Sequence, residues 1–392
     1  MGSLILSNTG FWVNIVAILL IAVIIYLKTK EFSPKEFLIQ IGVTSVLVFI
    51  SFNVFFSFNK DLVREEIWGG TAQSFIKEEG YEEEYDCSYE KCDSDGKNCR
   101  TISKTCERWI SEKRYINTSN KTKLSLSKQE FYNASRLFPT IEKKVYRASQ
   151  TYQSKLKGEG DIWISTPNTK VWTSEYHTYE NLVSASKYTI QRRQTHSEKE
   201  AKIKKEVLPY PVITYTKLGK FDFDRFIGSA SLNADIRKSY KKELKILAGV
   251  LGKTKQINPM IYVTNTDDIK FIDKLEIAWR KGNKNDSILI LHVDSSFKIK
   301  HTDVLSWAKD VAYNENLKKS MMGKNLSNVK EIISIYENEI KSTWVRKPMS
   351  EYDYLKGDIS LPMTYQLLII FINTLANIGL YYYFLRNRER RS

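Results

Sequence analysis

Three long apolar runs, none of which contains a charged residue, set the pattern of the chain. They cover residues 11–27, 37–58 and 361–385. At about 1.5 Å of rise per residue, helices of these lengths roughly match a hydrocarbon core about 30 Å thick. The pattern therefore predicts three transmembrane helices, two at the start of the chain and one at its end.

The first run could instead be a cleaved signal peptide. Such a peptide needs basic residues before the apolar run and small residues after it. Residues 1–10 contain no Lys or Arg, and the first basic residue, Lys28, follows the run. We therefore expect a retained membrane helix.

Basic residues flank the runs on one predicted side of the membrane. With three spans, the loop between the first two and the C-terminal tail share that side, and both are basic: Lys28, Lys30, Lys35, Arg386, Arg388, Arg390 and Arg391. Because basic loops stay in the cytoplasm, the loop 28–36 and the tail are predicted to be cytoplasmic. The N-terminus and residues 59–360 are then extracytoplasmic.

Between the anchors, the pattern divides at Pro209 and Pro211. We predict four parts: an anchor at 1–58, a strand-rich domain with cysteines at 59–210, an α/β domain at 211–360, and a final span with its tail at 361–392. In the third part, helical spacing at 231–251 alternates with buried-type strands at 259–264 and 288–293, and helices are predicted at 266–280, 304–312 and 325–344. This alternation favours an α/β (α+β) fold with a partly parallel sheet.

The strand-rich part is more irregular. A strand is predicted for 67–85, with the pair Gly69 and Gly70 stopping any helix that continues from the membrane. The acidic residues that follow, from Glu78 to Glu84, are interpreted as a solvated surface. Two short strands are predicted within 161–172, and helices at 127–136 and 196–207.

All four cysteines lie within twenty residues of one another: Cys87, Cys92, Cys99 and Cys106. Zinc sites usually have paired, closely spaced cysteines, and no His lies near these four. Two disulfides in an oxidising compartment suit the even count and the polar surroundings better. Three pairings are possible, and the sequence does not choose among them.

A net charge of +15 favours anionic partners such as lipid headgroups or cell-wall polymers, although plain solubility explains it as well. No cluster of basic residues interleaved with aromatics indicates a nucleic-acid groove. We expect contacts with membrane lipid and with other envelope proteins, and homo-oligomers are possible.

Two resemblances add to this picture. The stretches EIWGGTAQSFIKEEGYEEEYDC, GEGDIWISTPNTKVW and HTYENLVSAS, between two N-terminal spans and one C-terminal span, resemble uncharacterised membrane proteins of large tailed bacteriophages. That resemblance implies a phage-encoded membrane protein and supplies no chemistry.

The segment AWRKGNKNDSILILHV, within residues 221–351, is similar to the TPM domain, a family of membrane-anchored extracytoplasmic domains. The matching residues are Trp279, Gly282, Lys284, Asn285 and Asp286. The resemblance implies a role in the assembly or maintenance of membrane complexes, with phosphatase activity or divalent-ion binding in some members.

Candidate metal ligands follow the predicted strands. Asp267 and Asp268 come after one strand and Asp294 after the next, where open α/β sheets bind ligands. Such carboxylates suit Ca²⁺ or Mg²⁺. The pairs His292-x-Asp294 and His301-x-Asp303 form a second metal-like pattern, against the simpler interpretation that Asp294 turns the chain and His292 packs.

No nucleophile elbow, P-loop, zinc-protease or dinucleotide motif is present. In the last apolar run, Asn373 and Asn377 lie four residues apart on one helical face, which favours hydrogen bonding between packed helices. We therefore predict a membrane protein with a structural or interaction role at the cell envelope. The alternative is an extracytoplasmic, phosphatase-like hydrolase that depends on a divalent ion.

Overall fold

The computed structural model describes residues 9–29, 34–57, 62–93, 95–96, 99–135, 141–144, 160–167, 169–186, 188–191, 197–215, 221–228, 232–279, 282–359, 361 and 363–389. The predicted N-terminal tail, Lys30, Arg390 and Arg391 lie outside these residues. The chain forms two compact units: residues 1–66, 178–207 and 347–392 make the first, and residues 67–177 and 208–346 the second. Residues on both sides of the predicted boundary near 210 thus belong to the second unit.

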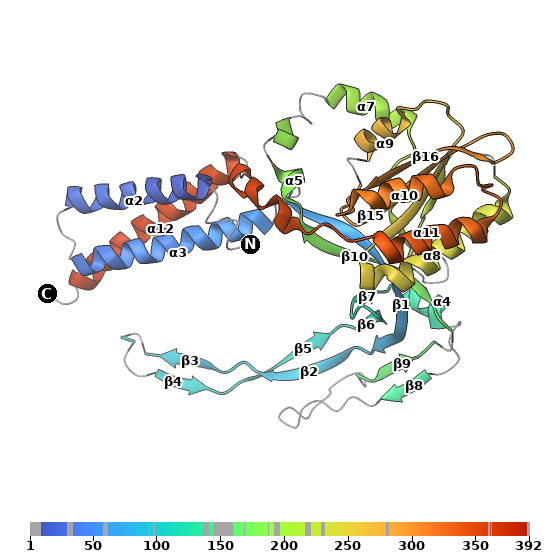
Figure 1. Cartoon of the computed structure of the whole chain (residues 1–392). Coiled ribbons are helices and arrows are strands. Elements are labelled where there is room, and N and C mark those ends of the chain that lie inside the picture. The colour runs from blue at the N-terminus through green and yellow to red at the C-terminus, as the bar shows by residue number, and fades with distance from the viewer. Residues whose placement is uncertain are drawn as a thin grey trace. The chain divides into compact units, whose positions relative to one another are not determined.

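Three helices make up most of the first unit. α2 (Thr9–Thr29), α3 (Pro34–Ser57) and α12 (Met363–Glu389) pack against one another side by side (Figure 1). Within the described residues, Pro34–Phe55 and Met363–Phe384 are long and apolar enough to cross a membrane, while the apolar stretch Phe11–Ile24 of α2 is shorter. Two of the three predicted spans therefore meet this criterion.

Short elements complete the first unit: α5 (Leu182–Ala185), α7 (Ser197–Glu206) and the 3-10 helix η1 (Met349–Asp358). Asn181 caps α5, since its side chain accepts a hydrogen bond from the Ser184 N–H at 2.9 Å. The Asn181 N–H in turn donates to the carbonyl of Leu62 at 2.7 Å. Leu62, α5 and η1 share one apolar cluster with the helix bundle.

The second unit contains an antiparallel sheet built on one long strand, β1 (Val63–Glu78). Its strand order is β7-β6-β1-β9-β8, and β10 also pairs with β1. The partners are β6 (Lys113–Thr118), β7 (Lys123–Ser125), β8 (Ile141–Lys144), β9 (Ile162–Ser165) and β10 (Trp172–Glu180), with the helix α4 (Lys128–Ser135) beside them.

The α/β part of the second unit is a four-stranded sheet in the order β13-β14-β15-β16. β13 (Phe226–Gly228), β14 (Asn258–Thr264) and β15 (Asp286–Val293) are parallel, and β16 (Ile299–Ser306) is antiparallel to β15. The helices are α8 (Ala234–Lys255), α9 (Phe271–Ala278), α10 (Val311–Met321) and α11 (Val329–Thr343), and a small hairpin of β11 (Ile213–Tyr215) and β12 (Phe221–Phe223) precedes the sheet.

Alternation along the central strands gives the sheet two apolar faces. Leu289 and Leu291 of β15 belong to the main core with α8, α10 and α11. Tyr262 of β14 and His292 of β15 point the other way and contact Phe271 of α9. The sheet is therefore covered on both sides, as expected for buried parallel strands (Figure 1).

The glycines of β1 have a different role from the predicted one. The strand continues through Gly69 and Gly70. A Cβ on Gly69 would lie 2.3 Å from the backbone carbon of Ala248 in α8, and a Cβ on Gly252 would lie 2.4 Å from the Gly69 carbonyl oxygen. The glycines thus let the backbones of α8 and β1 touch.

One predicted helix, at 304–312, is wrong. Val304 and Leu305 belong to β16, which pairs with β15 along its length, and α10 begins only after Asp310, whose side chain caps it. Pairing with a buried strand decides the conformation here, because short apolar runs fit a helix or a strand equally well by pattern. The predicted helices at 231–251 and 325–344 correspond to α8 and α11.

Candidate functional site

The turn between α9 and β15 carries the residues that resemble a TPM domain. Trp279, Lys284, Asn285 and Asp286 are all buried. Gly282 has φ of 68°, in the left-handed region that favours glycine. The Trp279 indole N–H donates to the Leu208 carbonyl at 2.8 Å. The turn is therefore held inside the second unit rather than exposed as a loop.

Asp286 is the hydrogen-bond acceptor at the centre of this turn. Its Oδ1 accepts from the Asn258 amide at 2.9 Å, and its Oδ2 accepts from the Tyr210 hydroxyl at 2.8 Å and from the Asn283 N–H at 2.7 Å. Burial raises the pKa of Asp286 to about 6, although these donors and Arg225 act in the opposite direction. Burial also raises the pKa of Tyr210 well above its ordinary value.

Arg225 is a buried cation that the sequence did not single out. Its Nε donates to Asn258 at 2.9 Å and its Nη1 donates to the Ser174 hydroxyl at 3.0 Å. The guanidinium also lies over the Phe223 ring, 5.2 Å from the centroid. Burial lowers the pKa of Arg225 to about 10, so the group stays charged at neutral pH.

Together these contacts join the α/β sheet to the antiparallel sheet. Arg225 reaches Ser174 of β10, and the Asn285 side chain donates to the carbonyl of Ile67 in β1 at 2.8 Å. A buried polar network of this kind fixes how the layers meet, since each group needs its partner. The turn before β15 is thus a structural joint within the second unit.

The three predicted metal ligands are engaged separately. Asp267 pairs with Lys300 at 2.9 Å, and Asp268 pairs with Lys274 at 3.1 Å. Asp294 accepts from the Ser296 N–H at 2.8 Å within its own turn. Across the part of the chain that the structure describes, no group of three His, Cys, Asp or Glu side chains could hold a metal ion.

Near these carboxylates, the ends of β15 and β16 form a compact titratable cluster. One Asp303 carboxylate oxygen, Oδ2, faces two imidazoles: His292 Nε2 at 3.4 Å and His301 Nε2 at 3.2 Å. The His292 Nδ1 lies 3.0 Å from the Thr266 carbonyl. His292 and Asp303 are 5% and 8% exposed, whereas the His301 side chain is 45% exposed. The sequence had paired His292 with Asp294, but the strand register places Asp303 beside it instead.

A second acid and imidazole pair, which the sequence did not indicate, lies on β10. Glu175 is fully buried, and its Oε2 is 3.8 Å from His177 Nε2. His177 stacks on Trp68 with ring centroids 4.0 Å apart, and burial lowers its pKa. A Cβ on Gly70 would lie 2.4 Å from Glu175 Oε1, so a larger residue there would displace this carboxylate.

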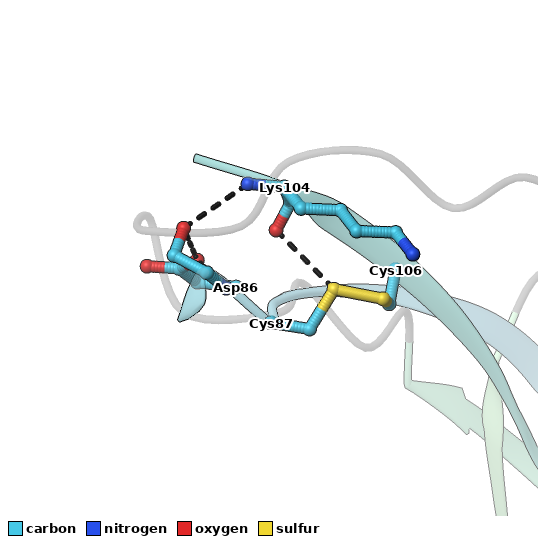
Figure 2. Close-up of a disulfide and its surroundings, with 5 residues drawn as sticks. Asp86, Cys87, Lys104 and Cys106 are labelled. Atoms are coloured by element: carbon cyan, nitrogen blue, oxygen red, sulfur yellow. Dashed lines mark hydrogen bonds between the residues drawn. A yellow bond between two sulfur atoms is a disulfide. The ribbon is translucent and has the colours of Figure 1, made fainter. Parts of the chain in front are cut away.

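The cysteines lie on a long two-stranded hairpin, residues 81–110, here called the hairpin arm. It consists of β2 (Tyr81–Asp86) paired with β5 (Thr105–Ile110), and beyond them β3 (Tyr89–Cys92) paired with β4 (Cys99–Ile102). Disulfides join Cys87 to Cys106 and Cys92 to Cys99, which resolves the three possible pairings. Figure 2 shows the first of these with Lys104 alongside it and Asp86 nearby.

The two faces of the hairpin arm differ in chemistry. On one face Arg108 pairs with Glu83 at 2.6 Å and lies over the Tyr85 ring. On the other, alternation brings together Glu82, Glu84, Asp86, Glu107 and Trp109. Glu84 lies directly opposite Glu107, a like-charge pair that weakens a ladder, and Trp109 is 56% exposed.

Polar residues also lie inside the helix bundle of the first unit. Asn373 and Asn377 of α12 are fully buried. The Gln40 side chain of α3 donates to Asn377 Oδ1 at 2.9 Å, and the Asn377 and Asn373 amides donate to carbonyls one turn earlier in α12. The predicted polar face of the last helix thus contacts α3.

Comparison with protein-family profiles and with curated proteins finds no match to this chain. The case for a function therefore depends on the residues and geometry described above.

Proposed function

We propose that this chain is a phage-encoded integral membrane protein that presents residues 59–360 outside the cytoplasm and acts there by contact with other envelope proteins. The two apolar helices α3 and α12 support membrane insertion. The two disulfides support an oxidising compartment for the segment between α3 and α12. The TPM-like resemblance of residues 221–351 agrees with a role in membrane-complex assembly.

The observation that carries this proposal is the hairpin arm. A two-stranded hairpin is marginally stable in water without a core. Here two disulfides cross-link the strands, while Trp109 and Tyr89 remain 56% and 50% exposed. The arm buries little of its own surface, yet two disulfides hold it in one conformation. We explain this by a role in which the exposed surface of the arm binds a partner. The arm is therefore the proposed contact element.

The carboxylates on which a divalent-ion hydrolase would depend are paired with lysines or lie in their own turn, so the catalytic alternative receives no support from geometry. A role in protein contacts does not require these carboxylates to meet at one site. The proposal thus favours an interaction protein over an enzyme.

The test uses the full-length protein in its native membrane. A photoreactive amino acid replaces Trp109 in one variant and Val311, an apolar residue 71% exposed on α10, in a matched control. We expect specific cross-linked products from position 109 and few from position 311. Equal cross-linking at both positions, or none at 109 with normal membrane insertion, would contradict the arm as the contact element.

A further inference from the structure

The cluster of His292, His301 and Asp303 has a hydrogen-bonding pattern that requires a proton. A carbonyl oxygen only accepts, so the contact between His292 Nδ1 and the Thr266 carbonyl, 3.0 Å long, places a hydrogen on Nδ1. In the neutral ring, Nε2 is then an acceptor. It faces Asp303 Oδ2, another acceptor, at 3.4 Å.

Both facing atoms are buried, and their residues are more than nine-tenths buried. His292 Nε2 has no hydrogen-bond donor beside it, and Asp303 Oδ2 lies 3.2 Å from one further group, the partly exposed His301 imidazole. Two buried acceptors in this arrangement cost free energy unless a hydrogen lies between them. A proton on Nε2 turns the contact into a charge-assisted hydrogen bond.

Several elements surround this proton. His301, Asp303 and Lys300 come from β16, and Phe271 of α9 meets the His292 ring edge to face at 6.0 Å. Asp267, in the segment before α9, pairs with Lys300 and adds negative potential at His292. Lys318 of α10 adds positive potential at Asp303.

The surroundings favour the charged ring. Burial by itself lowers the pKa of His292, but the contact with Asp303, the Thr266 carbonyl and the charges of Asp303 and Asp267 together raise it above the ordinary value. The pKa of Asp303 is lowered, since the two imidazoles and Lys318 outweigh its burial. The His292 ring therefore holds its second proton to a higher pH than an ordinary imidazole does.

We propose that His292, Asp303 and His301 form a proton lock that holds the segment from Thr266 to Phe271 against β16. The charged ring donates to both Thr266 and Asp303, whereas a neutral ring can donate to only one of them, so loss of the second proton breaks one contact and releases this segment and α9. The lock is closed while the ring holds its second proton and opens as rising pH removes that proton. Trp279 follows α9 directly and donates a hydrogen bond to the Leu208 carbonyl. Release of the helix at its N-terminal end therefore also affects the buried contacts of Trp279 at its C-terminal end.

The test measures hydrogen exchange of the peptide covering residues 265–279 in the full-length protein, corrected for intrinsic exchange at each pH. If opening is coupled to the loss of one proton, the population of the open state increases at most about tenfold per pH unit above the folded-state pKa of His292. In Asp303→Asn the amide can donate to the neutral Nε2, so we expect exchange that does not vary with pH. His301→Gln, which removes only the exposed imidazole, is expected to retain most of the dependence.

Histidine NMR titration gives a second measurement, which is made on the unmodified protein. The chain has four His residues, so assignment by single substitution is direct. We expect His292 to titrate above 6.5 in the unmodified protein. A His292 pKa at or below 6.5, or the same pH dependence of exchange in the unmodified protein and Asp303→Asn, would overturn the proposal.

Discussion

Single residues in this protein illustrate how burial changes chemistry. Asp286 follows a turn whose sequence is typical of an exposed loop. It nevertheless accepts three hydrogen bonds and is 1% exposed. Asp294, eight residues later, lies in an exposed turn, where its carboxylate accepts a hydrogen bond from the Ser296 backbone N–H. The sequence predicted Asp294 as a ligand and Asp286 only by resemblance, because composition cannot show which carboxylate becomes buried.

We predict that Asp286→Asn lowers the free energy of unfolding by about 1 to 2 kcal/mol at pH 7, since either amide orientation leaves one donor unpaired. The folded-state pKa of Asp286, about 6, is raised above its ordinary value of 3.8. Its contribution to stability is therefore greatest below pH 4 and falls as the pH rises to 6. This fall is expected to disappear in the variant, as measured by thermal unfolding in detergent.

Asp294→Asn is the matched control, because an amide oxygen can still accept the Ser296 N–H in its exposed turn. This control is expected to show the same decrease in the free energy of unfolding between pH 4 and pH 6 as the unmodified protein. The same decrease in Asp286→Asn as well would mean that Asp286 does not carry this pH dependence.

At the scale of elements, the hairpin arm owes its order to cross-links rather than to a core. Its described residues contribute none of the buried hydrophobic side chains of the chain. A disulfide that closes a loop of about 15 residues stabilises the folded state by about 3 kcal/mol, because it lowers the entropy of the unfolded chain. Each disulfide is therefore expected to stabilise its own part of the arm. The arm and the α/β core should then lose structure independently.

We expect the double substitution of Cys87 and Cys106 by Ser to increase hydrogen exchange across residues 81–110 at least tenfold, with little change in the melting temperature of the core. Substitution of Cys92 and Cys99 by Ser should affect only the outer part, residues 89–102. A core melting temperature that falls strongly with the first pair would show that the arm is part of the folding unit.

At the scale of the whole molecule, the predicted orientation of the chain does not depend on the number of spans. If the basic loop and the basic tail are cytoplasmic, residues 59–360 lie outside whether or not α2 crosses the membrane. Only the side of the N-terminus differs. α2 is 21 residues long and packs with α3 and α12, and Asn14 within it is buried, which favours a third span.

Reporter fusions can decide this. We expect a fluorescent protein that matures only in the cytoplasm to be bright after Ser392 and dark before Met1, and a periplasmic phosphatase to show the reverse. A bright N-terminal fusion with a bright C-terminal one would indicate two spans. A dark C-terminal fusion would reverse the orientation and remove the oxidising compartment from the argument.

The sequence by itself determined the apolar helices, the positions of α8, α11 and the strands β14 and β15, and the presence of disulfides. These features depend on local pattern: uncharged runs, helical spacing and the clustering of four cysteines. Such signals lie within one segment and need no knowledge of the fold.

Only the tertiary structure decided which distant residues meet. It paired Cys87 with Cys106, set Asp303 rather than Asp294 beside His292, and buried Arg225 next to Ser174. It also made β16 a strand where the sequence predicted a helix. Strand register and layer packing bring these residues together, and both are fixed by burial summed over many segments, which no single stretch of sequence contains.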